Sequence, residues 1–479
     1  MPHRLGFAIL RLCVPSRASF FARTTPSHLT VDLLKSLDDL VIDTASSLIG
    51  LDADRRQNCT ELINRSTSDG GFGIHRTQDT AHFAFLASSL HAESIIQNLT
   101  QKTETRTEAE VPPVKSCDFM KHIQHALSQH PGVRTLEDFN NDPCAFLSAH
   151  QVPRGLQHTL SLEAYAKKQE EHKTWLKQQT VGRKAHVAAT CAPGASNLIH
   201  LLKFNGQYHI NNDAWHTYCH IRLGHQSDWP SSLNGKCPLC DMDLTNDQAI
   251  NHALSCKNVR TTGKSTILHN RIVHKFVHSL RTIRPGLVTQ EYESQWSHNP
   301  NDLRPDFNTW TFDLHNEIIA TAYDFTAHSA TCPTNLTRTR ARIPENGGLM
   351  PPTATVDYYD QKKRDKYTAT ARENNFNFEP LAIELNGGFS RKTGAILKKW
   401  SEEHPDGLVF ADILHCELAR CCLDLHSQYY KAITQVIQGR RPRGCSSNIR
   451  APTYVVDASP NPPTLCVIPG STHALPVAS

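Results

Sequence analysis

The feature that most constrains this chain is a group of three cysteines and one histidine near its middle, within CPLCDMDLTNDQAINHALSC. The four residues are Cys237, Cys240, His252 and Cys256, separated by two, eleven and three residues. A CxxC turn brings two thiolates to one ion, and an HxxxC pair on a helix presents both side chains on one face. Three thiolates and one imidazole complete a closed tetrahedral site, which stabilises structure and leaves no position for a reacting water. The sequence therefore predicts a structural Zn2+ site, with buried free cysteines beside an incidental histidine as the alternative.

The segment between the two ligand pairs is expected to contain the start of a helix. Thr245 followed by Gln248 has the spacing of a capping box. A helix that starts there would turn Ile250 and Leu254 toward a small apolar core.

Composition narrows the classes of protein to which the chain can belong. Its 479 residues suffice for two to four domains. No run approaches the roughly 18 consecutive apolar residues of a membrane span, so we expect no membrane partner. Most of the fifteen cysteines are scattered along the chain, which favours a reducing compartment, nuclear or cytoplasmic, over a disulfide framework. The net charge of +4 is small, so any binding of nucleic acid must depend on local basic patches.

Apolar periodicity and chain breakers predict an α+β protein with a mostly helical N-terminal half. Helices are expected over residues 31–50, after a glycine turn within 70–90, over much of 117–190, and over 265–280. Strands are expected at 307–314 and 317–327, joined at His315 and Asn316, and again at 378–385. We expect a break at 193–196, a loop over 331–356, a further helix through DQKKRDKYTATARENNF, and two more helices after Gly387 and Gly388.

The strand region also holds candidate catalytic residues. Asp306 lies just ahead of the first predicted strand and Asp324 lies within the second. Metal-dependent phosphodiester cleavage requires two carboxylates that converge on a divalent ion. The predicted helix with Lys362, Lys363, Arg364 and Lys366 supplies positive charge nearby. The alternative is that Asp306 caps a turn and Asp324 is an ordinary strand residue.

The order of these motifs resembles the C-terminal part of non-LTR retrotransposon polyproteins of the restriction-like-endonuclease class. In that class a CCHC zinc knuckle precedes a nuclease of the PD-(D/E)-x-K type, and here the CxxC and HxxxC pairs precede HNRIV, RPD, a strand aspartate and KKRDKY. PLAIELNGGFSRKTGAILKKW, CAPGASNLIHLL, DAWHTYCHIRLG and GGFGIHRTQDTAHFAFLASSL are similar to further segments of the family. ILRLCVPSRASFFARTTPSHLT resembles the end of its polymerase thumb, so the resemblance spans roughly residues 7–440.

The resemblance implies a role for each matching residue. It assigns Cys237, Cys240, His252 and Cys256 to structural zinc; Asp306 and Asp324 to a catalytic Mg2+ or Mn2+; Lys363 and Lys366 to catalysis; and His269, Arg271, Arg304 and Tyr367 to nucleic-acid contacts. Thr326 occupies the usual position of the family's strand lysine. The catalytic lysine must then come from the later helix.

The resemblance also implies an organisation of the chain. Together with the composition, which indicates a flexible linker (101–115) and a disordered Pro-rich tail (441–479), it divides the sequence into further parts. These are a thumb remnant and post-polymerase helices (1–100), a helical linker region (116–230), the zinc knuckle (231–260) and the α/β nuclease core around a mixed sheet (261–440).

The first thirty residues contain four arginines and no acidic residue, which is typical of an organellar transit peptide. The match to a thumb helix favours an uncleaved helix instead. Since no YxDD palm motif occurs in the sequence, we expect the downstream part of a retroelement reading frame.

Three functions remain open from the sequence. The first is a Mg-dependent endonuclease that nicks DNA for target-primed reverse transcription, with DNA, the element RNA and a reverse transcriptase as partners. The second is a catalytically inactive, zinc-containing nucleic-acid-binding remnant. The third is a decaying retroelement product with no selected function. Basic patches cannot separate the first two, because phosphate contacts give affinity in both. The oligomeric state stays open.

Overall fold

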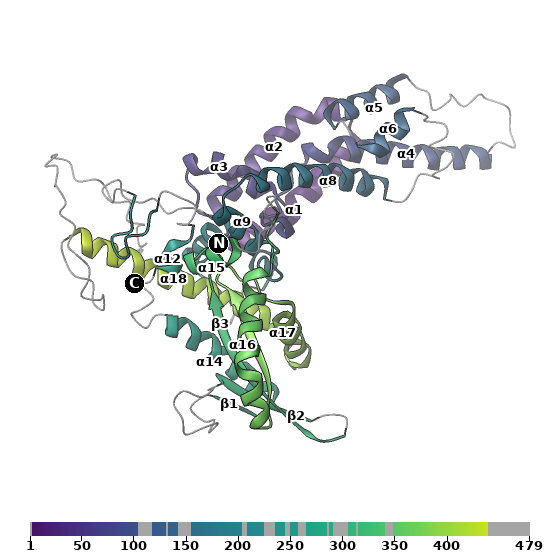
Figure 1. Cartoon of the computed structure of the whole chain (residues 1–479). Coiled ribbons are helices and arrows are strands. Elements are labelled where there is room, and N and C mark those ends of the chain that lie inside the picture. Colours follow the sequence, from purple (N-terminus) through teal and green to yellow (C-terminus); the bar gives the residue numbers. More distant parts are fainter. Residues whose placement is uncertain are drawn as a thin grey trace, which may run out of the picture.

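The computed structural model shows a mixed α+β protein, mostly helical, with a four-stranded mixed sheet (Figure 1). It describes residues 2–103, 117–130, 133–141, 155–203, 208–224, 235–244, 250–256, 265–284, 287–290, 305–312, 315–340 and 348–438. Most of the predicted linker at 101–115 and the predicted tail at 441–479 lie outside these residues.

The N-terminal helices form an elongated arm, purple to blue in Figure 1. They are α1 (His3–Thr24), α2 (Ser27–Leu48), α3 (Ala53–Asn64), α4 (Gln78–Thr103), α5 (Cys117–Gln129), α6 (Arg134–Asn141) and α8 (Leu156–Lys177). The predicted helix at 31–50 corresponds to α2. The backbone N–H groups of Thr77 and Gln78 donate to the two carboxylate oxygens of Asp38, each at 2.9 Å. This buried carboxylate from α2 therefore caps the start of α4.

Helix α1 is the one helix among the described residues that is long and apolar enough, by length and composition, to cross a membrane. Arg11 and Arg17 interrupt its apolar residues, so a search for consecutive apolar residues does not find this helix. A core helix passes the same test, and α1 packs on its neighbours here. The ring of Phe7 lies 5.8 Å from that of Phe72 and 5.6 Å from that of Trp215, measured between centroids.

The arm joins the rest of the molecule through α9 (Val181–Thr190), α10 (Asn197–His200) and α11 (Asn212–Leu223). The buried guanidinium of Arg222, at the end of α11, holds this junction. It donates to the carbonyl oxygens of Gly71 at 2.9 and 3.1 Å, Thr67 at 2.9 Å, Ala195 at 2.9 Å and Thr190 at 3.3 Å. Carbonyls from three segments are thus satisfied by one planar group.

The predicted break at 193–196 is confirmed, and this segment packs tightly against the residues that follow β4. Gly194 has φ +83°, and a Cβ added there would lie 2.1 Å from the ring of Phe389. The backbone N–H of Phe389 donates to the carbonyl of Pro193 at 3.0 Å. Only glycine fits this contact between the linker and the segment after the last strand.

The sheet has the strand order β1-β2-β3-β4. The strands are β1 (Val288–Gln290), β2 (Phe307–Phe312), β3 (Ile318–His328) and β4 (Asn377–Glu384). The first two pairings are antiparallel, and β3 pairs with β4 in parallel. The three predicted strands are confirmed, whereas the short β1 was not predicted.

A parallel pair requires a long crossover, which here consists of α15 (Pro333–Arg340) and α16 (Ala354–Glu373). The predicted loop over 331–356 is therefore wrong in part, because it contains α15 and the start of α16. Proline at the first position of a helix loses no hydrogen bond, so Pro333 can start α15.

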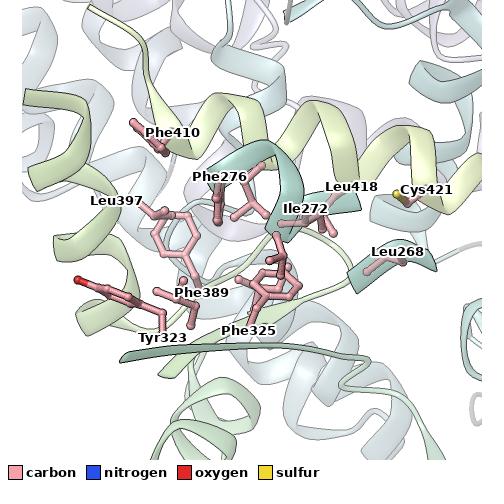
Figure 2. Packing of buried hydrophobic residues seen from close by; sticks show 14 of the residues in the cluster. Leu268, Ile272, Phe276, Tyr323, Phe325, Phe389, Leu397, Phe410, Leu418 and Cys421 are labelled. Atoms are coloured by element: carbon pink, nitrogen blue, oxygen red, sulfur yellow. The ribbon is translucent and has the colours of Figure 1, made fainter. Parts of the chain in front are cut away.

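Helices cover both faces of the sheet (Figure 1). On one face α14 (Ser265–Ile283), α17 (Arg391–Glu403) and α18 (Phe410–Ile437) enclose an aromatic core that includes Phe276, Tyr323, Phe325 and Phe410 (Figure 2). On the opposite face α16 packs on β3 and β4. Because strand side chains alternate between faces, Tyr323 and Phe325 enter the core and Asp324 lies on the α16 side.

A second core is built from segments far apart in the sequence. It contains Phe7 of α1, Trp215 of α11, and Ile413 and Cys416 of α18. The predicted regions 1–100, 116–230 and 261–440 therefore all contribute residues to this core.

Candidate metal centre and candidate active site

The four predicted zinc ligands come together. One ligand atom from each of Cys237, Cys240, His252 and Cys256 lies within 4.8 Å of the others. The two cysteines of the CxxC turn are positioned by a tight backbone loop in which the N–H groups of Cys240 and Asp241 donate to the carbonyl of Cys237 at 3.3 and 2.8 Å. Asp241 has φ +57°, which is typical of such a turn.

The second ligand pair lies on a single helical turn. α12 (His252–Ser255) carries the histidine, and the N–H of Cys256 donates to the carbonyl of His252 at 2.8 Å. This places both side chains on one side, as the HxxxC spacing predicted. The proposed capping residues Thr245 and Gln248 lie outside the described residues.

The donor set fits a soft or borderline metal ion. The cluster could bind a metal such as zinc, since three thiol sulfurs and one imidazole nitrogen are the ligands that structural zinc sites use. Cys240 Sγ lies 3.3 Å from His252 Nε2. Burial lowers the pKa of His252, but hydrogen bonds to Cys237 and Cys240 outweigh it and raise the pKa to about 9. Zinc binding requires deprotonated cysteines and a neutral imidazole, so metal affinity should fall as the pH is lowered.

The metal cluster is packed into the larger fold. Its apolar surface joins Tyr429 and Ile433 of α18 in one small core. The side chain of Asn251 donates to the carbonyl of Ile221 at 3.2 Å, and Thr331 Oγ1 donates to the carbonyl of Ile250 at 2.8 Å.

Asp306 is fixed at the start of β2 by three contacts. Its backbone N–H donates to the carbonyl of Tyr323 at 2.8 Å. Its Oδ2 accepts from the N–H of Phe325 at 2.5 Å and pairs with Nε2 of His269, from α14, at 3.0 Å. Burial lowers the pKa of His269, but the bond to Asp306 and its charge raise the value to about 9. His269 was expected to contact nucleic acid, and the structure places it on a candidate metal ligand.

Asp324 lies one strand away, under α16. Lys363 Nζ donates to its Oδ2 at 2.5 Å. Burial raises the pKa of Asp324, Lys363 lowers it, and the charge of Asp306 raises it, with a net value of about 6. The two aspartates are therefore near enough to influence each other.

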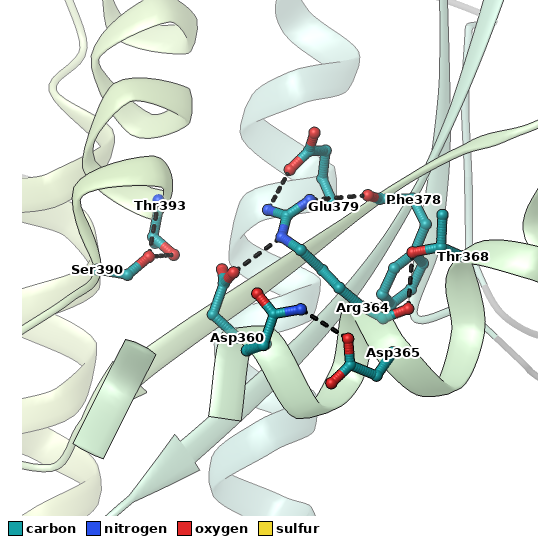
Figure 3. A network of polar contacts seen from close by, with 9 residues as sticks. Asp360, Arg364, Asp365, Thr368, Phe378, Glu379, Ser390 and Thr393 are labelled. Carbon is teal, nitrogen blue, oxygen red and sulfur yellow. Dashed lines mark hydrogen bonds and ion pairs between the residues drawn. The ribbon is translucent and has the colours of Figure 1, made fainter. Parts of the chain in front are cut away.

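Helix α16 is held on the sheet by Arg364 (Figure 3). Its guanidinium donates to Asp360 Oδ2 at 2.8 Å, to Glu379 Oε2 at 2.7 Å and to the carbonyl of Phe378 at 3.3 Å. Two of these partners lie on β4, so the bonds fix the rotation of α16. Lys363, the neighbouring residue, consequently points at Asp324.

The remaining predicted site residues have different environments. Lys366 is exposed, with Nζ 4.6 Å from the ring centroid of Tyr367, and that ring packs 5.7 Å from Phe378. Arg271 forms ion pairs with Asp424 at 2.6 Å and Glu417 at 3.4 Å, which join α14 to α18. Arg304 lies outside the described residues.

A row of polar residues beside the candidate site was not predicted. The ring of His328 stacks on Tyr359 with centroids 3.2 Å apart, and its Nε2 lies 2.7 Å from Thr326 Oγ1. Glu384, which pairs with His328 in the sheet register, is buried, and burial raises its pKa to about 8. Thr326 and His328 are two residues apart on β3, and this spacing could have predicted that they lie on one face with Asp324. The burial of Glu384 could not be predicted from the sequence.

No protein-family model matches the chain, and no curated protein matches its sequence.

Proposed function

We propose that this chain is the downstream part of a retroelement protein and acts as a metal-dependent DNA endonuclease of the restriction-like type. It would nick target DNA and expose a 3′ hydroxyl for target-primed reverse transcription. The observation that carries the proposal is the placement of Asp306 immediately before β2, with its N–H on the carbonyl of Tyr323, and of Asp324 on the neighbouring β3, where Lys363 of α16 contacts it.

The donor set suits a hard divalent cation. Asp306 and Asp324 would hold Mg2+ or Mn2+, since such ions prefer carboxylate oxygens and water. The hydrogen bonds that described residues donate to these two carboxylates all end on Oδ2. When bound, the ion supplies charge to polarise a phosphate and to lower the pKa of the attacking water.

The other residues have separable roles in this proposal. Lys363 lowers the pKa of Asp324 against the larger effect of burial and would stabilise the negative charge that develops on the phosphate. His269 and the N–H of Phe325 orient Asp306. Lys366, exposed on the same helix, would contact the DNA backbone and add affinity without specificity.

A second candidate function is a catalytically inactive, zinc-containing nucleic-acid-binding remnant. It is favoured by the fact that both aspartates already have cationic or proton-donating partners, Lys363 and His269. Such pairs also suit a fold that has kept its structure without cleaving DNA. The third function left open by the sequence, a decaying retroelement product, differs from this inactive remnant only in lacking a selected role.

Plasmid nicking by the purified full-length chain separates these functions. Supercoiled DNA should be nicked in Mg2+ or Mn2+ and should stay intact when the divalent ion is omitted. Asp306→Ala and Asp324→Ala should each abolish nicking while DNA binding persists. Binding without cleavage by the wild type would favour the inactive remnant, and equal cleavage by wild type and Asp306→Ala would attribute the activity to a contaminant. Partnership with the element RNA and a reverse transcriptase is part of the same proposal.

A further inference from the structure

One residue from outside the CxxC and HxxxC pairs contacts two of the four ligands. Tyr429 lies on α18, and its side chain is 0% exposed. Its hydroxyl oxygen lies 3.2 Å from Cys237 Sγ, although the two residues are 192 positions apart. Its ring meets the imidazole of His252 edge to face, with centroids 5.8 Å apart.

The chemistry of these contacts gives the hydroxyl a direction. A phenol is an O–H donor at neutral pH, and a metal-bound cysteine is a thiolate, which only accepts. The bond would therefore run from the Tyr429 hydroxyl to the sulfur. A donor to a ligating sulfur fixes its orientation and withdraws negative charge from it, and such outer partners change metal affinity measurably.

The surroundings make this bond hard to replace. Ile433 and Val436, one and two turns further along α18, belong to the same buried apolar cluster as Cys237, Leu239 and Leu244. Cys237 and Tyr429 are both 0% exposed, and the hydroxyl is the polar partner that the described residues provide for Cys237 Sγ beyond the ligands themselves.

We propose that Tyr429 is an outer member of the metal centre, whose hydroxyl holds the Cys237 thiolate and whose ring positions His252. Metal affinity then depends on the docking of α18. The reverse also holds, because a metal that binds only the folded site stabilises the packing that it requires. The proposal does not depend on DNA cleavage.

The experiment compares zinc binding by the full-length protein and its Tyr429→Phe variant. Phenylalanine keeps the ring and removes only the hydroxyl. Competition with a chromophoric chelator should show Zn2+ affinity lower by about tenfold or more. The sulfur-to-metal charge-transfer band of the Co2+-loaded protein should shift. Tyr430→Phe is the matched control, since Tyr430 is the neighbouring tyrosine and is 38% exposed; it should match the wild type.

A second variant separates the hydroxyl from packing. Ile433→Ala loosens the same core and leaves the hydroxyl in place, so it should lower thermal stability without shifting the Co2+ band. Unchanged zinc affinity and an unchanged band in Tyr429→Phe would overturn the proposal. Equal shifts in Tyr429→Phe and Ile433→Ala would also overturn it, because packing alone would then account for both. An inactive nuclease would leave all these readouts intact.

Discussion

Lys363 Nζ lies 2.5 Å from Asp324 Oδ2, and this ion pair joins α16 to β3 across the face of the sheet opposite α14. The carboxylate is buried and the lysine is largely so. A buried charge that loses its partner is costly. The same contact therefore has a structural and a catalytic consequence, and the two can be measured separately.

Replacing Lys363 with alanine should lower the free energy of unfolding by about 1–3 kcal/mol, because a buried carboxylate loses a charged partner. Nicking should fall by about two to three orders of magnitude if the lysine stabilises the transition state. Lys366→Ala is the control, since Lys366 is exposed. It should leave stability unchanged and mainly weaken DNA binding and its salt dependence. Equal effects of the two substitutions on nicking would contradict the assignment of Lys363.

Glu384 should make stability depend on pH. Its pKa is raised from 4.5 to about 8 by burial, so between these values the folded protein binds a proton that the unfolded chain has released. Stability therefore falls as pH rises from about 4.5 to about 8, by at most about 5 kcal/mol. Glu384→Gln should flatten this slope in denaturant titrations across that range. Glu402→Gln, at an exposed position, should retain it. A wild-type curve without the slope would show that Glu384 is ionised in the folded state.

Cys240→Ser should remove the metal and unfold the segment around it. A closed site loses most of its affinity with one thiolate. Elemental analysis should find one zinc per wild-type chain and none in the variant, and limited proteolysis should cleave the variant between residues 235 and 256. Cys13→Ser, at an exposed position, should behave like the wild type. Metal-free wild-type protein with unchanged melting in Cys240→Ser would count against the site.

Arg222→Lys should be strongly destabilising, although the substitution keeps the positive charge. An ammonium has three donors and cannot reproduce the planar fork that reaches four carbonyl oxygens. Losing two such bonds should cost about 3 kcal/mol or more, visible as a lower denaturant midpoint. Arg134→Lys, whose side chain is 89% exposed, should leave the midpoint in place. A similar midpoint for both variants would mean that the junction tolerates lysine.

Residues 1–40 fused to a fluorescent reporter should not accumulate in mitochondria. Arg4 and Phe7 are buried against the rest of the fold, so this helix is part of the packed structure. Mitochondrial fluorescence in transfected cells would show that the arginine-rich segment is a targeting signal.

The parts that could be predicted from the sequence depend on local spacing. The metal cluster is built from two short pairs, and the two β-rich runs put Asp306 immediately before β2 and Asp324 within the neighbouring β3. The choice of Lys363 over Lys366 could not be predicted, because the rotation of α16 is set by bonds from Arg364 to β4. The hydrogen bond between His269 and Asp306 likewise depends on the packing of α14 against β1 and β3.

Contacts between distant segments gave no local signal. Tyr429 meets Cys237 from 192 residues away, and nothing around Tyr429 in the sequence marks it as a neighbour of a metal ligand. Burial of Glu384 depends on how α16 covers β4. The helix α15 was missed because its composition of proline, threonine and arginine is also typical of loops.

The core that joins Phe7, Trp215 and Ile413 has a consequence for synthesis. After Phe7 is translated, the ribosome must add about 400 more residues before Ile413 can pack against Phe7. At the usual rate of synthesis this takes roughly 20 to 80 seconds. During this interval the inner side of α1 lacks one of its final partners. The nascent chain should therefore bind holdase chaperones until α18 emerges, and ribosome-bound chains that stop before residue 410 should be more sensitive to protease at α1 than chains that stop after residue 438.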